Sequence, residues 1–424
     1  MGEERLVPKL RFGGFDDEWK ELSLIEISKK IGDGMHATPK YVDNSNYYFI
    51  NGNNLDNKNI VINEDTKCVP LEEYEKHKIN FKNTILISIN GTIGNLAYYN
   101  SETVILGKSA AYINLNENIN KEFIFNYLQI GKVKYYFNSE LTGSTIKNLS
   151  LKTLKNTKIH IPSDNAEINK ISNFLENIDN KIQLLIEKHQ QYLNFKKYLM
   201  QQIFAQKLRF DFAEEWKKYL LGDISLIGKG FTPSTSNPSF WDGDLKWLSI
   251  ADMNQGKYIN QTTKTITYDG SKNKEPVKKG TLLMSFKLSI GKLGILTEDM
   301  YTNEAICNFK WKNKDVLTEY MYYYLSSINI LKYGSQAAKG ITLNNETLST
   351  IPVLLPSLEE QKKIIDILSG VDLKINMLKN SIYDISKFKK GLLQQMFVYI
   401  LMHTILNFCA KICCIKYFLK SRYS

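Results

Sequence analysis

The chain has 424 residues, of which 43% are hydrophobic, 12% aromatic and 23% charged. This length predicts two or three domains, and the composition excludes a disordered or fibrous protein. The formal net charge of +11 favours a polyanionic partner, with nucleic acid ahead of an acidic membrane surface. Lys-rich proteins of AT-biased genomes are basic without such a partner, so charge alone leaves that alternative open.

The first residues, MGEERLVPKLRFGG, lack the apolar segment of a secretory signal, which indicates a cytoplasmic protein. Cys68 and Cys307 are isolated in the sequence, so no disulfide framework is predicted. Three further cysteines lack the paired spacing of a zinc site and are interpreted as free thiols: Cys409, Cys413 and Cys414. Polar residues interrupt the apolar segment around them, so we expect a packed or surface-lying helix and not a membrane span.

The chain repeats itself with a period of about 195 residues. FKKYLMQQIF at 195–204 and FKKGLLQQMF at 388–397 share seven of ten letters. KLRFGGFDDEW at 9–19 corresponds to KLRFDFAEEW at 207–216, and further matches follow in the same order. A period this long predicts two copies of a whole domain and excludes a solenoid.

Short apolar or alternating segments make up most of each copy, and they predict a mixed α/β domain around a largely antiparallel sheet. Apolar or alternating runs separated by Gly, Asn and Asp turns are expected to form strands, at 47–55, 84–90, 95–100 and 110–116 in the first copy and at 245–253, 281–287, 292–298 and 305–312 in the second. Helical segments are expected to follow them, at 121–138 and at 317–334.

Each copy ends in about 40 residues whose apolar side chains recur at alternating steps of three and four. This spacing predicts two long helices, one from each copy, that pair as an antiparallel coiled coil. The expected pairing positions are Leu175, Ile178, Ile182, Leu185, Leu368, Val371, Ile375, Leu378 and Ile382. His189 corresponds to Ile382 and is therefore interpreted as a packing residue. The opposed seams would explain the repeated phrase.

The predicted fold class is thus α+β, with two mixed α/β domains separated by the two long helices. The expected segments are a first α/β domain at 1–163, a first helix at 164–206, a second α/β domain at 207–356, a second helix at 357–397 and an apolar, basic extension of unknown role at 398–424.

No catalytic or metal-binding set is predicted. GKS at 107–109 lacks the first glycine of a phosphate-binding loop, whose place holds Glu102. NPSF at 237–240 resembles the Asn-Pro-Pro-Tyr/Phe motif of adenine methyltransferases, but Ser239 replaces the second proline and no glycine-rich cofactor loop precedes it. The remaining histidines have no carboxylate or cysteine at ligand spacing: His36, His77, His160 and His403.

Loops at matching positions of the two copies combine Lys, Asn, Ser, Thr and Gly with aromatic residues. Lysines and hydroxyls suit phosphate contacts, whereas Asn, Gln, Arg and Lys read base edges. Such loops are often only turns, but their recurrence in both copies favours DNA binding. Candidates in the first copy are Lys40, Tyr41, Asn51, Asn53, Asn90, Thr92, Ser144, Thr145 and Lys147. Candidates in the second copy are Lys229, Thr232, Ser234, Lys287, Ser289, Lys292, Lys339, Thr342 and Asn344.

Several motifs resemble specificity subunits of Type I restriction-modification systems. GDGMHATPKY with FINGNNL, and GKGFTPSTSNPSFWDGDLKWLSIADM, resemble the opening motifs of their target recognition domains. GITLNNETLSTIPVLLPSLEEQKKI and FKKGLLQQMF resemble the family's passage into its conserved helix and its closing phrase. The resemblance covers residues 9–397.

The resemblance implies a non-catalytic subunit that reads a bipartite site in double-stranded DNA. It implies recruitment of two modification subunits, which methylate adenine, and of restriction subunits, which act as motor and nuclease. S-adenosylmethionine, ATP and magnesium are then expected in the partner subunits, and no cofactor in this chain.

The sequence departs from the family pattern where the first helix opens PSDNAEINKI, because the usual Glu-Gln pair is missing at Asn165, Ala166 and Glu167. Two other functions are weighed. An adaptor of a modification-only or anti-restriction system would lack modification and nuclease genes beside its own. A fused methyltransferase would bind S-adenosylmethionine as the isolated chain.

Overall fold

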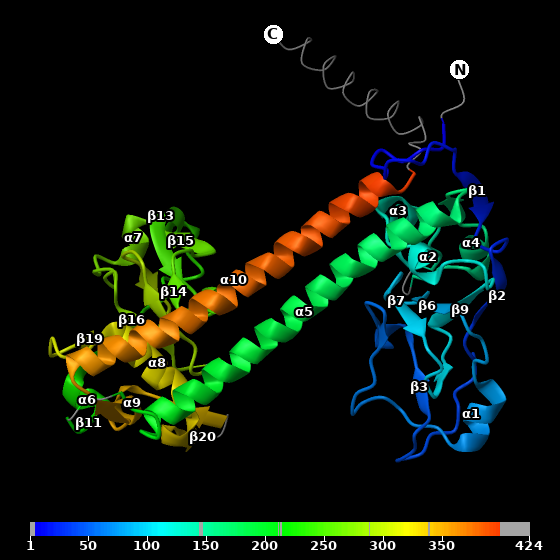
Figure 1. Cartoon of the computed structure of the whole chain (residues 1–424). Coiled ribbons are helices and arrows are strands. Elements are labelled where there is room, and N and C mark those ends of the chain that lie inside the picture. Colours follow the sequence, from blue (N-terminus) through cyan, green and yellow to red (C-terminus); the bar gives the residue numbers. More distant parts are fainter. Residues whose placement is uncertain are drawn as a thin grey trace, which may run out of the picture. The chain divides into compact units, whose positions relative to one another are not determined.

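The computed structural model describes residues 5–143, 147–210, 212, 214–287, 289–337 and 340–398, and within 335–342 it describes the backbone only. The chain divides into two compact units, and many of their elements are labelled in Figure 1. The first unit comprises the described residues up to Leu184 and those from Ser381 onward, and the second runs from Leu185 to Asn380. The extension 398–424, apart from Val398, and its cysteines lie outside the described residues.

The first unit is built on a four-stranded antiparallel sheet in the order β2-β9-β6-β7. Every residue of the central strand β6 is buried, because its side chains alternate between two apolar cores. Ile85 and Ile87 enter the core beneath the helices, and Leu86 enters the opposite one. The sheet strands are β2 (Ser28–Asp33), β6 (Thr84–Ser88), β7 (Leu96–Tyr99) and β9 (Ala110–Leu115).

Shorter strands and helices complete this unit. The strands pair as β1 (Lys20–Ser23) with β10 (Lys158–Ile161), β3 (Tyr48–Ile50) with β8 (Val104–Leu106), and β4 (Leu55–Asp56) with β5 (Asn59–Ile60). The helices are η1 (Gly52–Asn54), α1 (Leu71–His77), α2 (Lys121–Tyr127), α3 (Gly131–Ser139) and α4 (Leu151–Lys155).

The second unit repeats this plan with a sheet in the order β12-β19-β16-β17-β14, antiparallel except for the last pair. Leu282 and Met284 of its strand β16 enter one core and Leu283 the other, as in β6. The mixed α/β fold and the largely antiparallel sheet predicted for each copy are confirmed. The sheet strands are β12 (Ser225–Lys229), β14 (Tyr258–Ile259), β16 (Leu282–Ser285), β17 (Leu293–Leu296) and β19 (Ile306–Trp311).

The remaining elements of the second unit are also short. The other strands are β11 (Lys217–Leu220), β13 (Trp241–Leu248), β15 (Lys264–Ile266), β18 (Tyr301–Thr302), β20 (Ser335–Ala337), β21 (Gly340–Thr342) and β22 (Pro352–Leu355). The helices are α6 (Leu221–Ile224), η2 (Pro238–Phe240), η3 (Ala251–Gln255), α7 (Tyr268–Ser271), α8 (Thr318–Ser327), η4 (Ile330–Tyr333) and α9 (Asn345–Ser349).

The two long helices are α5 (Asn165–Phe204) and α10 (Leu358–Met396), and part of each belongs to each unit. In the first unit they run in opposite directions, with Lys389 Nζ of α10 2.6 Å from Asp179 Oδ1 of α5 (Figure 1). In the second unit Lys196 Nζ lies 2.6 Å from Asp372 Oδ1. The predicted antiparallel helix pair is therefore present.

Burial along the predicted seam depends on position. Leu175 and Leu368 are fully buried where the helices meet the α/β cores, and Ile375 and Leu378 are also buried. The other expected pairing residues are half-buried: Ile178, Ile182, Leu185, Val371 and Ile382. His189 is half-buried as well.

The repeated phrase also packs into the α/β cores, in addition to its place on the paired helices. In the first unit, Phe397 at the end of the second copy of the phrase packs edge-on against Trp19 and Phe123. In the second unit, Phe204 at the end of the first copy packs against Tyr320 and Tyr324. Each copy of the phrase thus completes the core of the other copy's α/β domain, which the heptad spacing alone could not reveal.

Candidate nucleic-acid interface

Equivalent turns follow the central strand of each unit and end at Gly94 in the first unit and Gly291 in the second. In the first unit Gly94 N donates to Ser88 O at 2.9 Å, and in the second Gly291 N donates to Ser285 O at 2.8 Å. Both glycines have positive φ, 86° and 88°, which other residues rarely adopt. The turn therefore presents the short loop before each glycine at one edge of its sheet.

Backbone hydrogen bonds gather further segments around this turn in the first unit. Ser109 O accepts from Ile89 N at 2.9 Å, and Ser109 Oγ accepts from Gly52 N at 2.9 Å. Lys147 O accepts from Gly91 N at 3.2 Å. Gly34 N donates to Ala110 O at 3.0 Å and Met35 N to Leu106 O at 2.8 Å. We call residues 34–35, 51–53, 89–94, 107–109 and 147–148 the first loop cluster.

The predicted contacts of the first copy divide by exposure. Asn51 is half-buried and accepts from Ser109 Oγ at 2.8 Å, so its side chain shapes the cluster. Asn90 is half-buried in a β-bridge with Asn148. Ser144 and Thr145 lie outside the described residues. The side chains of the remaining candidates are exposed at the surface: Lys40, Tyr41, Asn53, Thr92 and Lys147.

The second unit has an equivalent loop cluster, formed by residues 229–234, 286–287, 289–292 and 302–305. Phe231 N donates to Thr302 O at 2.8 Å, and Phe286 N donates to Ala305 O at 3.0 Å. The half-buried Thr232 accepts from Asn303 Nδ2 at 2.9 Å and donates to Glu304. These contacts bring two predicted loops of this copy together.

The other candidates of the second copy differ in how exposed their side chains are. Lys229, Ser234, Lys287 and Ser289 are exposed, and Lys292 is half-buried. The predicted Lys339 lies outside the described residues, and the side chain of Thr342 in β21 is not described. Asn344 is exposed, but its side chain accepts from Thr347 N at 2.8 Å and caps α9.

One pair of residues that the sequence analysis did not select occupies the same turn in the two clusters. Lys108 is exposed immediately before Ser109, and Glu304 stands immediately before Ala305. Ser109 O and Ala305 O accept equivalent backbone hydrogen bonds. A lysine suits a phosphate or guanine, whereas a carboxylate accepts from the amino group of cytosine. The GKS letters were a usable signal, because they place a lysine in a turn between two buried strands.

A hollow of about 360 Å³ adjoins the first loop cluster. Its lining includes Lys30, Lys76 and Lys78 together with the rings of Phe81 and Tyr112. Lys30 Nζ lies 5.4 Å from the centroid of the Phe81 ring. Cationic side chains beside aromatic faces suit a nucleic-acid strand.

The histidines have closer carboxylates than their spacing suggested, which corrects the sequence interpretation. His36 Nε2 lies 2.8 Å from Asp33 Oδ2, and His160 Nε2 lies 3.1 Å from Glu21 Oε2. The chain fold brings Glu21 to His160 across β1 and β10. Burial, with a further effect of Lys132, lowers the pKa of His160. No group of three metal-ligating side chains occurs in the described part of the chain.

The NPSF segment is a turn. Asn237 Oδ1 accepts from Ser239 N at 3.1 Å and from Ser239 Oγ at 2.8 Å, so the amide is engaged within the loop. Among the described residues, no helix is both long and apolar enough to cross a membrane.

Residues 16–193 and 213–386 match the family of the Type I restriction modification DNA specificity domain. The chain belongs to this family. Its matched segments contain both loop clusters and most of both long helices. Each copy of the repeat is therefore a DNA specificity domain of this family, and the two α/β domains are its target recognition domains.

Relatives of this specificity family extend over different parts of the chain. The MjaIX specificity subunit of Methanocaldococcus jannaschii is 30% identical over 166 residues, which is 38% of this chain and 38% of that protein. The EcoBI specificity subunit of Escherichia coli is 22% identical over 313 residues, covering 66% of this chain and 65% of that protein. The match thus spans little more than a third of the first relative.

Solved structures share the fold of this specificity subunit family. The S subunit of the Type I restriction-modification system from M. genitalium superposes with a TM-score of 0.56 at 16% identity, covering 93% of this chain and 100% of that one. A chain from a study of complex assembly and conformational transition of the type I R-M system gives 0.58 at 14% identity, covering 90% and 98%.

Proposed function

We propose that this chain is the specificity subunit of a Type I restriction-modification complex and that its two recognition domains read the two halves of a bipartite DNA site. The observation that carries the proposal is the pair of loop clusters, built by the same backbone contacts on the same turn. The clusters differ in charge at one position, Lys108 against Glu304, so the two half-sites should differ in sequence.

Partner subunits would dock on the exposed faces of the long helices. Phe388 in the first unit is 58% exposed, and Phe195, at the same place in the repeated phrase, is 48% exposed in the second. Aromatic side chains this exposed are typical of protein interfaces. We assign one modification subunit to each unit and place S-adenosylmethionine, ATP and magnesium in the modification and restriction subunits.

The docking assignment is tested by replacing Phe388 with Ser. One of two modification subunits should then be lost from the purified complex, because the face in the second unit is intact. The measurement is the mass of the complex in solution. Phe388→Tyr keeps the ring and serves as the control. A variant complex of unchanged mass would remove Phe388 from the interface.

The function is tested by sequencing methyladenine in DNA from the host, with and without this gene. We expect methylation at an interrupted, asymmetric site that disappears with the gene. Replacing one recognition domain should change the sequence of one half-site only. Methylation that is independent of the gene would contradict the proposal, and methylation without cleavage would indicate a modification-only system.

A further inference from the structure

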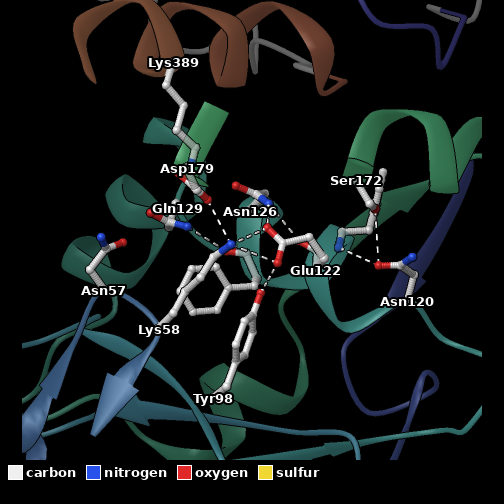
Figure 2. A network of polar contacts seen from close by, with 12 residues as sticks. Asn57, Lys58, Tyr98, Asn120, Glu122, Asn126, Gln129, Ser172, Asp179 and Lys389 are labelled. Carbon is white, nitrogen blue, oxygen red and sulfur yellow. Dashed lines mark hydrogen bonds and ion pairs between the residues drawn. The ribbon is translucent and has the colours of Figure 1, made fainter. Parts of the chain in front are cut away.

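A network of charged side chains in the first unit joins the recognition domain to both long helices (Figure 2). Lys58 Nζ lies 2.8 Å from Glu122 Oε1 of α2 and 2.9 Å from Asp179 Oδ2 of α5. Lys389 Nζ of α10 lies 2.6 Å from the other oxygen of Asp179. Lys58 itself follows β4, in the turn before β5. Four side chains from segments far apart in the sequence therefore form a row in which negative and positive charges alternate.

The network is enclosed and its four charged groups are paired. The four charged side chains are only 10% to 20% exposed. Tyr98 donates to Glu122, and Asn126 Nδ2 donates to Glu122 Oε1 at 2.7 Å. Burial lowers the pKa of Lys58, but its hydrogen bonds to Glu122 and Asp179 raise it by more, so the net pKa is raised. The amine therefore remains charged.

Lys58 is the second residue of the two-residue turn that joins β4 to β5. Its φ of 75° lies in the left-handed region, which residues with a Cβ rarely adopt. Both residues of this turn, Asn57 and Lys58, have positive φ, as two-residue hairpin turns require. The cation also lies 5.6 Å from the Tyr98 ring centroid and 5.7 Å from that of Phe125.

The second unit contains a related network at equivalent places of the repeat, in which a tyrosine hydroxyl stands between the two ion pairs. Lys196 Nζ lies 2.6 Å from Asp372 Oδ1, and Lys257 Nζ lies 3.4 Å from Glu319 Oε1. The Tyr323 hydroxyl links the two pairs, since it donates to Asp372 at 2.7 Å and lies 3.3 Å from Lys257 Nζ. Lys196 and Lys389 are the first lysines of the two FKK sequences. Each network therefore takes its helix lysine from the repeated phrase that the other copy contributes.

Stability alone does not account for two such networks. Each recognition domain already shares an apolar core with the ends of the long helices. Replacing a buried ion pair by apolar groups of similar volume often leaves the stability of the protein unchanged. Charged and hydrogen-bonding groups differ because only one arrangement of the packed elements satisfies all of them. Directional contacts added to an apolar core restrict orientation.

We propose that each network fixes the orientation of its recognition domain on the helix pair of the same unit. The helix lysines Lys389 and Lys196 would then position the loop clusters for DNA recognition. This inference rests on the proposed function. A domain held in one orientation places its loop cluster at one position along the duplex, and the spacing between half-sites is then restricted.

The test compares Lys389→Met and Lys196→Met with the unchanged chain, each assembled with its modification subunits. The substrate is a DNA library in which the two half-sites are separated by spacers of the natural length and of one or two base pairs more or fewer. Sequencing of methyladenine gives the use of each spacer. We expect the unchanged complex to use one length and both variants to use neighbouring lengths roughly tenfold more.

Matched controls are the adjacent exposed lysines, Lys390→Met and Lys197→Met, which should keep the narrow preference. Lys58→Met is a second variant, because Asp179 keeps Lys389 as its partner. The inference would be overturned if Lys389→Met and Lys58→Met kept a spacer preference as narrow as that of an active unchanged complex. Loss of folding in both would assign the network to stability and also overturn it. Failure of the unchanged complex to methylate a bipartite site would instead contradict the proposed function.

Discussion

At the scale of single residues, the repeat places the same buried ion pair at the start of each long helix. Arg11 binds Glu167 through two hydrogen bonds of 2.7 and 2.8 Å, and Arg209 binds Glu360 in the same way. Both glutamates are 1% exposed. Glu167 therefore keeps the place of Glu360, which corrects the expectation that the first helix had lost both residues of the Glu-Gln pair.

Removing Arg11 should destabilise the first unit strongly. Arg11→Met leaves the Glu167 carboxylate buried without its partner, which costs roughly 3 kcal/mol of unfolding free energy. Arg5→Met is the control, because the Arg5–Glu18 pair is exposed and should contribute less than about 1 kcal/mol. Denaturant unfolding of both variants checks the difference. Equal midpoints would show that Glu167 finds another partner.

Lysines of the loop clusters should contribute to DNA affinity without regard to sequence. Replacing Lys287 and Lys292 by Ala removes positive charge from the loop of the second cluster. Each lost phosphate contact should lower the slope of log affinity against log salt by about 0.9. Binding titrations at several salt concentrations measure the slope. Lys314→Ala, on an exposed turn of the same unit, is the control, and an unchanged slope for the loop variant would exclude these lysines from the interface.

At the scale of elements, the long helices combine a buried seam with exposed apolar residues. Leu378 is 6% exposed, whereas the adjacent Met377 is 54% exposed. The contrast follows from helix geometry, because successive residues point about 100° apart. The seam holds the helices together, and the opposite face remains available to a partner.

Asp at Leu378 should disrupt the helix pair, because it buries a charge without a partner. We expect a loss of several kcal/mol of unfolding free energy and joint loss of assembly and methylation. Asp at Leu185, which is half-buried, should cost less. Thermal unfolding is compared with Met377→Asp, which should unfold near the temperature of the unchanged chain. Full methylation with Asp at both seam positions would contradict the paired helices.

At the scale of the whole molecule, the two copies exchange their helix ends. The core of the second unit contains Leu199, Met200 and Ile203 from the first copy of the phrase. The core of the first unit contains Leu392, Leu393, Met396 and Phe397 from the second copy. Neither recognition domain is complete without the end of the other copy's helix.

A fragment of residues 207–397 should therefore form a dimer. It lacks the phrase at 195–204 but carries its own at 388–397, and the two share seven of ten letters. Two fragments related by a two-fold axis can each supply the phrase that the other needs. Its mass in solution should be that of a dimer, and selection from random DNA should yield an inverted repeat of the second half-site. A well-folded monomer, or selection of a single asymmetric half-site, would contradict the exchange.

Local patterns were sufficient for much of the architecture. The central strands β6 and β16 were visible as apolar runs between turns, and α5 and α10 as heptads. Gly94 and Gly291 stand at matching places of the two copies, and their positive φ explains why both are glycine. The choice among polar loop residues was less reliable, because Asn51 and Asn344 have the composition of DNA contacts but are engaged in loop and cap hydrogen bonds.

The sequence by itself determined the duplication, the α/β character of each copy and the antiparallel helix pair, because these depend on periodicity and on spacing along the chain. Only the tertiary structure decided which copy of the phrase completes which core, that Lys58 meets Asp179 and Lys389, and that Lys108 and Glu304 occupy the same turn. Those contacts join residues far apart in the chain, and the close approach of a buried charge to its partner leaves no periodic trace in either segment.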